Sequence, residues 1–273
     1  MRFLLLITIT CLLSPASIHA QIIQGKVVSQ DSKGIPYAIV QVKEMNTGIY
    51  TNEQGNFTIN ALAGMTLVVQ CLGYERAEIP VNGIQYPFVI KLTEKNMGLP
   101  EVVVKATNPT LRTLGIKDLT ATGRTGAATG YEQGVYLYDK KAKKGTLEEV
   151  YVYIASRGIP DTPFRIHVYE ANRKTKLPVR ELTRDNIIAH ADSADQWVRI
   201  YIKDKNIRIK GAIIVTMEWL SGYNKDGELI GPSLGLATPP VKIYNYSRYN
   251  LQERKDNSFL PGTTAMIYCT YKK

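Results

Sequence analysis

The first side chains to consider for chemistry in this 273-residue chain are its three histidines, because histidine serves both metal sites and general bases. His167-Val-Tyr-Glu170 has a His-x-x-Glu spacing suited to zinc, but the surrounding residues alternate like a β-strand. Residues three apart on a strand point to opposite faces, so His167 and Glu170 should not share an ion. The sequence therefore predicts no metal site and no cofactor.

Arrangements for nucleophilic or acid–base catalysis are equally hard to find. His190 and Ser193 lie in a polar loop, and no Gly-x-Ser-x-Gly elbow occurs. Glu148 and Glu149 would point to opposite faces of a strand, which does not indicate a glycosidase pair. We predict no catalytic residues, although a triad assembled from distant loops stays open, because such groups meet in space rather than in sequence.

Tyrosines that share strand faces are the most suggestive binding feature, and they fall in three pairs: Tyr136 with Tyr138, Tyr151 with Tyr153, and Tyr244 with Tyr246. Sugar-binding sandwiches stack aromatic rings on apolar sugar faces, and polar neighbours hydrogen-bond the hydroxyls. The alternative is a structural role, since tyrosine is a preferred strand residue. We predict Tyr223, Tyr136 and Tyr138 as ligand-binding residues, and we expect Trp197 and Trp219 in the core.

The N-terminal part of the chain is a series of short alternating segments. Ala38, Val40 and Val42 share one face of such a segment. Asn52-Glu-Gln-Gly-Asn56 predicts a tight turn in which Gly55 takes positive φ. Six or seven strands in about 80 residues, separated by turns, predict a β-sandwich.

Residues 22–104, which end in Leu99-Pro-Glu-Val-Val-Val104, resemble the carboxypeptidase regulatory-like domain of many Gram-negative envelope proteins. The resemblance implies a small transthyretin-like sandwich and a compartment, but no reaction. The family's turn usually carries Thr-Asp, whereas Thr51-Asn52 stands here without that charge. TonB-dependent receptors have a similar segment before a plug and a large barrel. The roughly 170 residues that follow here are too few for that barrel, which argues against a transporter.

Longer alternating segments after Gly130 predict a second antiparallel sandwich, jelly-roll-like or galactose-binding-like, in an all-β chain. The galactose-binding resemblance rests on the order of a strand after Pro163, a turn at Pro178 and the segment Trp197-Val-Arg-Ile. The predicted division is a signal peptide at 1–20, a regulatory-like sandwich at 21–106, a Gly- and Thr-rich linker at 107–131 and the second sandwich at 132–273.

The first 20 residues are typical of a secretory signal, with Arg2, an apolar run and cleavage after Ala20. A lipoprotein signal at Cys11 is the alternative, but Thr8-Ile-Thr10 is a poor lipobox. No other run approaches the ~18 apolar residues of a membrane span. We therefore predict an exported chain with no transmembrane span once processed, either periplasmic or associated with the outer membrane.

The formal net charge of +10 would suggest nucleic acid in a cytosolic protein. Export instead favours an envelope protein or a glycan as partner, including an anionic polysaccharide, and no nucleic acid.

Cys71 and Cys269 remain after processing, either as buried thiols or as a disulfide. The sequence thus predicts a non-enzymatic binding or assembly module of the cell envelope, associated with glycan or with an outer-membrane complex. The alternative is a carbohydrate-active enzyme or hydrolase with a loop-assembled site.

Overall fold

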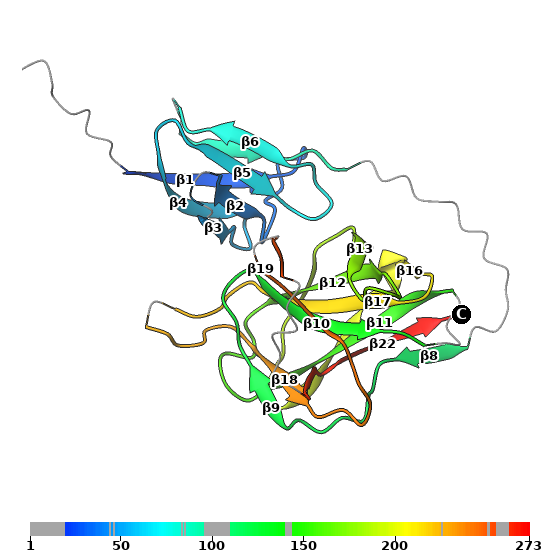
Figure 1. Ribbon diagram of the computed structural model, residues 1–273. Helices are drawn as coiled ribbons and strands as arrows, with labels where there is room; N and C mark the ends of the chain where they lie inside the picture. Colours follow the sequence, from blue (N-terminus) through cyan, green and yellow to red (C-terminus); the bar gives the residue numbers. More distant parts are fainter. Residues whose placement is uncertain are drawn as a thin grey trace, which may run out of the picture. The chain divides into compact units, whose positions relative to one another are not determined.

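In a computed structural model, the regular structure of the described residues consists of β-strands and one 3₁₀ turn, η1, at Lys203–Lys205 (Figure 1). The structure describes residues 20–43, 45, 47–82, 84, 86–95, 110–139, 144–224, 226–249, 252–254 and 262–273. These residues form two compact units, unit 1 within residues 1–97 and unit 2 within residues 98–273. Most of the predicted signal peptide, and the segment from Leu99 to Val104, lie outside the described residues.

Unit 1 is the predicted sandwich of seven short strands in two sheets. One sheet has the order β4 (Asn56–Leu62), β1 (Ala20–Val28) and β7 (Phe88–Lys91). The other has the order β3 (Thr47–Tyr50), β2 (Ile39–Val42), β5 (Thr66–Gln70) and β6 (Ala77–Pro80). The predicted face of Ala38, Val40 and Val42 is fully buried in the core between the sheets.

The turn predicted at Asn52 forms as expected, with Gly55 at φ 83°. The Asn52 side-chain oxygen accepts hydrogen bonds from the N–H groups of Gln54 (3.0 Å) and Asn56 (2.9 Å). Buried Thr51 donates to the Ile35 carbonyl (2.7 Å) and accepts from the Ala38 N–H (2.9 Å). An amide oxygen therefore orders this turn without the carboxylate that the regulatory-like family usually places there.

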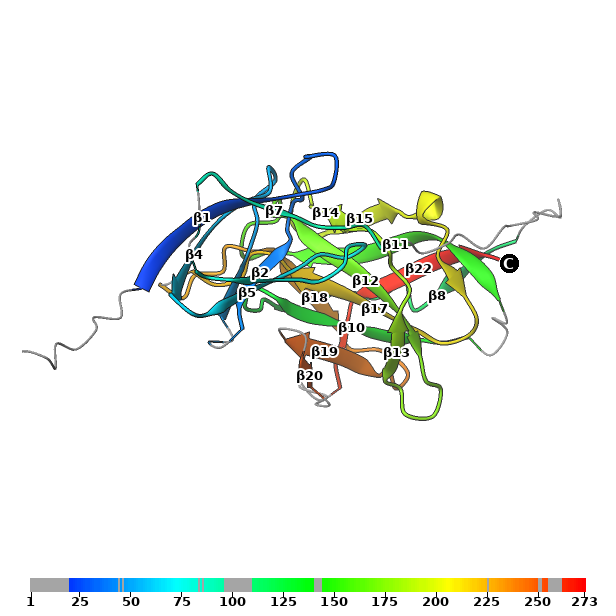
Figure 2. The same ribbon diagram turned by 90° about the horizontal axis from the view of Figure 1, so that it is seen from above.

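Unit 2 is a larger sandwich of two sheets (Figure 2). The seven-stranded sheet contains β13 (Pro178–Glu181), β12 (Phe164–Ala171), β17 (Ile213–Trp219), β10 (Tyr131–Leu137), β19 (Asn245–Tyr249) and β20 (Gln252–Arg254), with β14 (Ile187–Ala189) also paired to β12. The eight-stranded sheet contains β21 (Thr264–Ala265), β18 (Ser233–Ala237), β11 (Gly145–Ala155), β22 (Ile267–Lys272) and β8 (Leu111–Leu114), with β15 (Gln196–Tyr201) and β16 (Arg208–Ile209) on β11 and β9 (Gly123–Thr125) on β18.

Both sheets of unit 2 place alternate residues in one shared apolar core. Val215 and Met217 come from the seven-stranded sheet, and Val150 and Val152 from the eight-stranded one. The intervening residues of each strand form an outer face on each sheet, and those two faces carry the polar and aromatic groups considered below.

Two sequence predictions need correction or refinement here. The linker predicted at 107–131 is wrong where β8 and β9 lie, because both strands pair into the eight-stranded sheet. Cys71 and Cys269 are not joined by a disulfide, and each is buried in the core of its own unit. Whether unit 2 is closer to a jelly roll or to a galactose-binding sandwich stays a prediction. No helix in the described part of the chain is long and apolar enough to cross a membrane.

Candidate functional site

The outer face of the eight-stranded sheet carries a group of aromatic rings, here called the aromatic face: Tyr151, Tyr153, Trp197 and Tyr268. Strand pairing brings them together, because Tyr151 lies opposite Tyr268 and Tyr153 lies opposite Trp197. A Cβ at Gly235 would come within 2.5 Å of the Tyr153 ring, so this glycine makes room for it.

The ring geometry favours Trp197 as the ligand-contacting ring of the aromatic face. Tyr151 and Tyr268 stack on each other, with centroids 4.4 Å apart and planes 8° from parallel. Trp197 is steeply inclined to both of its neighbours, at 80° to Tyr153 (5.5 Å) and 69° to Tyr268 (4.9 Å). Because the two stacked tyrosines cover each other, half-buried Trp197 is the ring best placed to stack on a ligand.

Polar groups border these rings. Glu149 accepts hydrogen bonds from the Tyr151 hydroxyl (2.8 Å), from Thr270 (3.1 Å) and from the Arg199 guanidinium (3.0 Å from Nε). Burial alone would raise the pKa of Glu149, but these donors outweigh it and hold the pKa below its usual value. Burial and the hydrogen bond to Glu149 raise the pKa of Tyr151 to about 12. Glu149 is therefore a charged hydrogen-bond acceptor at neutral pH.

The predicted opposite orientation of Glu148 and Glu149 is wrong. A β-bulge in β11 shifts the pairing register between Leu147 and Glu149. Leu147 and Val150 both enter the core, so both glutamates face outward. Glu148 forms an ion pair with Lys272 (3.1 Å), an outer-face residue of β22. Two carboxylates therefore share the face that also carries the rings.

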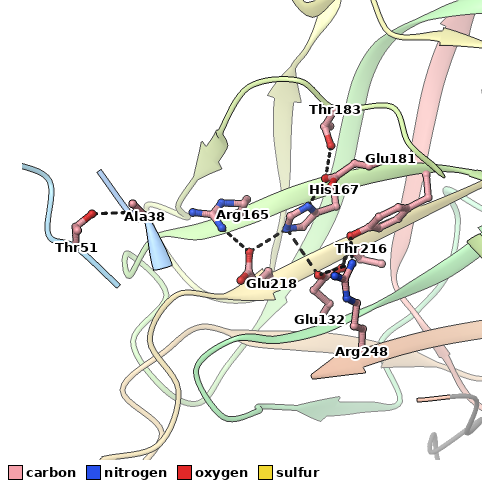
Figure 3. Close-up of polar contacts among 11 residues, drawn as sticks. Ala38, Thr51, Glu132, Arg165, His167, Glu181, Thr183, Thr216, Glu218 and Arg248 are labelled. Carbon is pink, nitrogen blue, oxygen red and sulfur yellow. Dashed lines mark hydrogen bonds and ion pairs between the residues drawn. The ribbon is translucent and has the colours of Figure 1, made fainter. Parts of the chain in front are cut away.

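The outer face of the seven-stranded sheet holds a second polar group, here called the charged cluster: Glu132, Arg165, His167, Glu181, Glu218 and Arg248 (Figure 3). His167 contacts Glu181 through Nδ1 (2.6 Å) and Glu218 through Nε2 (2.9 Å). Arg165 donates to the same Glu218 oxygen (2.9 Å).

The rest of the charged cluster centres on Glu132, which accepts hydrogen bonds from Tyr169 (2.8 Å) and Thr216 (3.1 Å). Arg248 lies 3.8 Å from its second oxygen. Three cations thus meet three carboxylates on one face.

His167 is held as a cation in this cluster. Burial alone would lower its pKa, but the carboxylates of Glu132, Glu181 and Glu218 outweigh burial and raise the pKa to about 10. A protonated imidazole cannot accept a proton or bind a metal through a lone pair. Glu170 forms an ion pair with Arg180 instead (2.6 Å). Within the described residues, no group of three His, Cys, Asp or Glu side chains is suited to hold a metal ion.

The residues predicted to bind ligand lie in two places. Tyr136 and half-buried Tyr138 meet at the end of β10, and Tyr136 packs edge-on against Tyr244 (6.1 Å). Tyr223 is 44% exposed in the loop after β17, beyond the opposite end of the same sheet. Their role in binding stays a prediction, but the structure does not bring Tyr223 together with the other two.

The prediction for the tryptophans is half right. Trp219 is fully buried and donates its indole N–H to the Pro232 carbonyl (2.7 Å). Trp197 lies on the outer face, which contradicts its predicted core position. The signal was present in the sequence, because Val198 and Ile200 form the apolar side of the same strand and Ile202 continues the alternation just after it. Trp197 and Tyr268 are thus the residues of the candidate site that the sequence reasoning missed.

Comparison with known proteins identifies the N-terminal unit. Residues 23–104 match the family model of the CarboxypepD_reg-like domain. No curated protein matches the chain in sequence. Among solved structures, a DUF3823 family protein from Bacteroides ovatus is similar at 12% identity, with 93% of this chain and 97% of that chain covered and a TM-score of 0.22.

The infectious bursal disease virus VP2 subviral particle is similar at 9% identity, with 95% of this chain and 62% of that chain covered and a TM-score of 0.27. Both TM-scores are too low to indicate a shared overall fold. The family match and the observed sheets agree on the first unit, and the chain carries a CarboxypepD_reg-like domain at residues 23–104, followed by a second β-sandwich.

Proposed function

We propose that this protein is an exported, non-enzymatic binding module of a Gram-negative cell envelope, and that it binds glycan on the aromatic face. The observation that carries the proposal is Trp197, a half-buried indole on an outer sheet face, braced by Tyr153 and Tyr268. Apolar sugar faces stack on such rings, and rings locked by their neighbours lose little conformational entropy on binding.

Hydrogen-bonding groups suited to sugar hydroxyls flank that ring. The exposed guanidinium of Arg199 lies over the Tyr201 ring (4.5 Å) and keeps several donors after pairing with Glu149. On the other side, Asp195 accepts a hydrogen bond from the Ser156 N–H (2.8 Å), and its negative charge adds to burial in raising the pKa of Tyr153. A ligand on Trp197 therefore meets a donor group and an acceptor group at opposite ends of the aromatic face.

The chemistry of the outward glutamates favours binding over hydrolysis. A glycosidase needs one carboxylic acid that stays protonated near neutral pH, which requires a raised pKa. The pKa of Glu149 is lowered instead. Glu148 is engaged in an ion pair with Lys272 (3.1 Å). His167, held as a cation, offers no general base on the other sheet.

Export and envelope association complete the proposal. They are supported by the signal-like N-terminus and by the regulatory-like domain at 23–104, a module that the sequence resemblance links to envelope proteins. An exposed edge strand would offer an envelope protein a means of association by strand addition.

The proposal is tested on the processed chain with a glycan array, followed by calorimetric titration of the best ligand. Trp197→Ala is expected to weaken binding about 30-fold, the loss typical of truncating a central aromatic anchor. Tyr223→Ala serves as the matched control, because this tyrosine is also partly exposed but lies on a loop of the other sheet.

Three results would count against this proposal. Absence of binding to any glycan would remove its central element, and loss of binding in Tyr223→Ala with full binding in Trp197→Ala would move the site to the loop. Turnover of a bound glycan that disappears in Glu149→Gln would instead establish the hydrolase alternative.

A further inference from the structure

The hairpin between β12 and β13, residues 172–177, presents three cationic side chains on a stiff loop. The Asn172 side chain accepts hydrogen bonds from the N–H groups of Lys174 (2.8 Å) and Thr175 (3.2 Å). Its backbone pairs with Lys176 and with Leu177 (both 2.9 Å). Lys176 takes a left-handed φ of 63°. These bonds fix the loop that carries Arg173, Lys174 and Lys176, here called the cationic hairpin.

A cluster of tyrosines lies against the cationic hairpin at this end of the seven-stranded sheet. The Lys176 ammonium is 4.7 Å from the ring centre of Tyr136 and 5.6 Å from that of Tyr244. The Arg173 guanidinium lies 4.6 Å from the centre of the Tyr138 ring and donates to its hydroxyl. A fourth cation, Lys242, lies 5.3 Å from the Tyr244 ring.

These rings are firmly placed. Tyr136 packs in a small apolar cluster with Tyr169, Ala171, Ala212, Ile214 and Tyr246, and Tyr138 and Tyr244 pack against its edge. The cations are therefore oriented by ring faces and phenolic oxygens, which are electron-rich but carry no net charge. Their positive charge is not neutralised by these contacts.

The two ends of this outer face differ in their charge balance. At one end, Arg165, His167 and Arg248 meet three carboxylates. At the other end, no ion pair joins a carboxylate to Arg173, Lys174, Lys176 or Lys242 among the described residues. Lys176 also keeps one of its three N–H donors after bonding to Tyr136 and to the Arg173 carbonyl. Arg173 keeps four of its five.

We propose that the cationic hairpin, with Lys242 and the Tyr138 hydroxyl, forms an anion-binding site for a phosphate monoester group. A phosphate monoester carries up to two negative charges and three acceptor oxygens, which suits several neighbouring cations better than a single carboxylate does. This site lies on the sheet opposite the aromatic face, so it does not rest on the glycan proposal.

The proposal is tested by calorimetric titration of the processed chain at low salt with three probes: inorganic phosphate, glucose 1-phosphate and glucose. Both phosphates are expected to bind, and glucose is not expected to compete for this site. Lys176→Gln combined with Lys242→Gln should weaken phosphate binding by about tenfold or more, because charge-assisted hydrogen bonds are lost. Arg173→Gln, at an exposed position, gives the same test if the double variant does not fold.

Lys203→Gln is the matched control, because this lysine is exposed on unit 2 away from the hairpin. Tighter binding of glucose 1-phosphate than of phosphate would assign the site to a phosphorylated glycan, and equal binding to the free anion. The proposal is overturned if neither phosphate binds, or if Lys203→Gln loses as much affinity as the hairpin variants. Trp197→Ala should leave phosphate binding intact, so failure of one proposed site does not decide the other.

Discussion

His167 shows how neighbouring charges set the role of a single side chain in this protein. Three carboxylates surround it, and they raise its pKa to about 10 although burial acts in the opposite direction. The same carboxylates neutralise Arg165 and Arg248. A histidine whose spacing suggested a zinc ligand is therefore a cation at neutral pH in a charge-matched cluster, which points to a structural role.

This cluster predicts a pH dependence of stability. The folded-state pKa of His167 lies above its unfolded value of 6.5, so its contribution is fully present below pH 6.5 and is lost as pH rises toward 10. The loss across that range is on the order of 4 kcal/mol, because each pKa unit corresponds to roughly 1.4 kcal/mol. Urea unfolding between pH 6 and 8.5, below the range in which the buried Cys269 thiol adds its own pH dependence, should show a steeply falling free energy of unfolding in the native chain but not in His167→Gln.

His190→Gln provides the control for that measurement, since it replaces an exposed histidine outside the charged cluster. At the acid side, the pKa of Glu181 is lowered below 4.5 because its contact with His167 outweighs burial, so its contribution is lost as pH falls below that value. Stability from this pair is therefore greatest between about pH 4.5 and 6.5. Identical pH slopes for the native chain and His167→Gln would contradict the assignment.

Residue types alone could not locate the candidate binding site. Tyr151 and Tyr153 were recognisable as a pair on one strand face, and their alternation is observed. Their partners Trp197 and Tyr268 lie 44 and more residues further along the chain and join them only through strand pairing. Cross-strand neighbours depend on register, and a single sequence does not determine which strands are adjacent.

At the scale of elements, the β-bulge in β11 has the largest effect on the chemistry. Strict alternation would place Glu148 and Glu149 on opposite faces, as the sequence predicted. The extra residue between Leu147 and Glu149 turns both outward instead. A bulge leaves no clear mark in the sequence when neither residue is glycine, so this prediction failed for a physical reason.

The short strands β8 and β9 were missed because runs of four and three residues carry little periodic signal.

The pairing of β10 with β17 predicts a strong effect at Gly134. A Cβ there would come within 1.9 Å of the Val215 carbonyl oxygen and 2.6 Å of the Thr216 Cα, so Gly134→Ala must push two central strands apart. We expect a destabilisation of roughly 2–4 kcal/mol, within the range of overpacked interior sites. Urea unfolding of the native chain and of Gly134→Ala measures this difference in the free energy of unfolding.

Gly123→Ala is the control for this element, because a Cβ at Gly123 meets nothing closer than 3.7 Å. It should change the free energy of unfolding by less than about 0.5 kcal/mol. Equal stabilities of the Gly134 and Gly123 variants would show that the two central strands are not as closely paired as described.

At the scale of the whole molecule, the division of the chain into two β-sandwich units was largely predictable. Short alternating segments and turn residues predicted two all-β sandwiches, and the first is confirmed as a CarboxypepD_reg-like domain. The net charge of +10 did not reveal where cations gather, and the structure shows Arg173, Lys176 and Lys242 against tyrosine rings at one end of the seven-stranded sheet. Both proposed ligand sites lie on unit 2, on opposite outer faces.

The most direct test of glycan binding on the aromatic face uses the two tryptophans of the chain. Incorporation of 5-fluorotryptophan gives one ¹⁹F NMR resonance from Trp197 and one from fully buried Trp219, assigned with a Trp197→Phe variant. Titration with a glycan selected on the array is predicted to shift or broaden the Trp197 resonance and leave the Trp219 resonance in place. A bound glycan that leaves the Trp197 resonance unchanged would contradict the account.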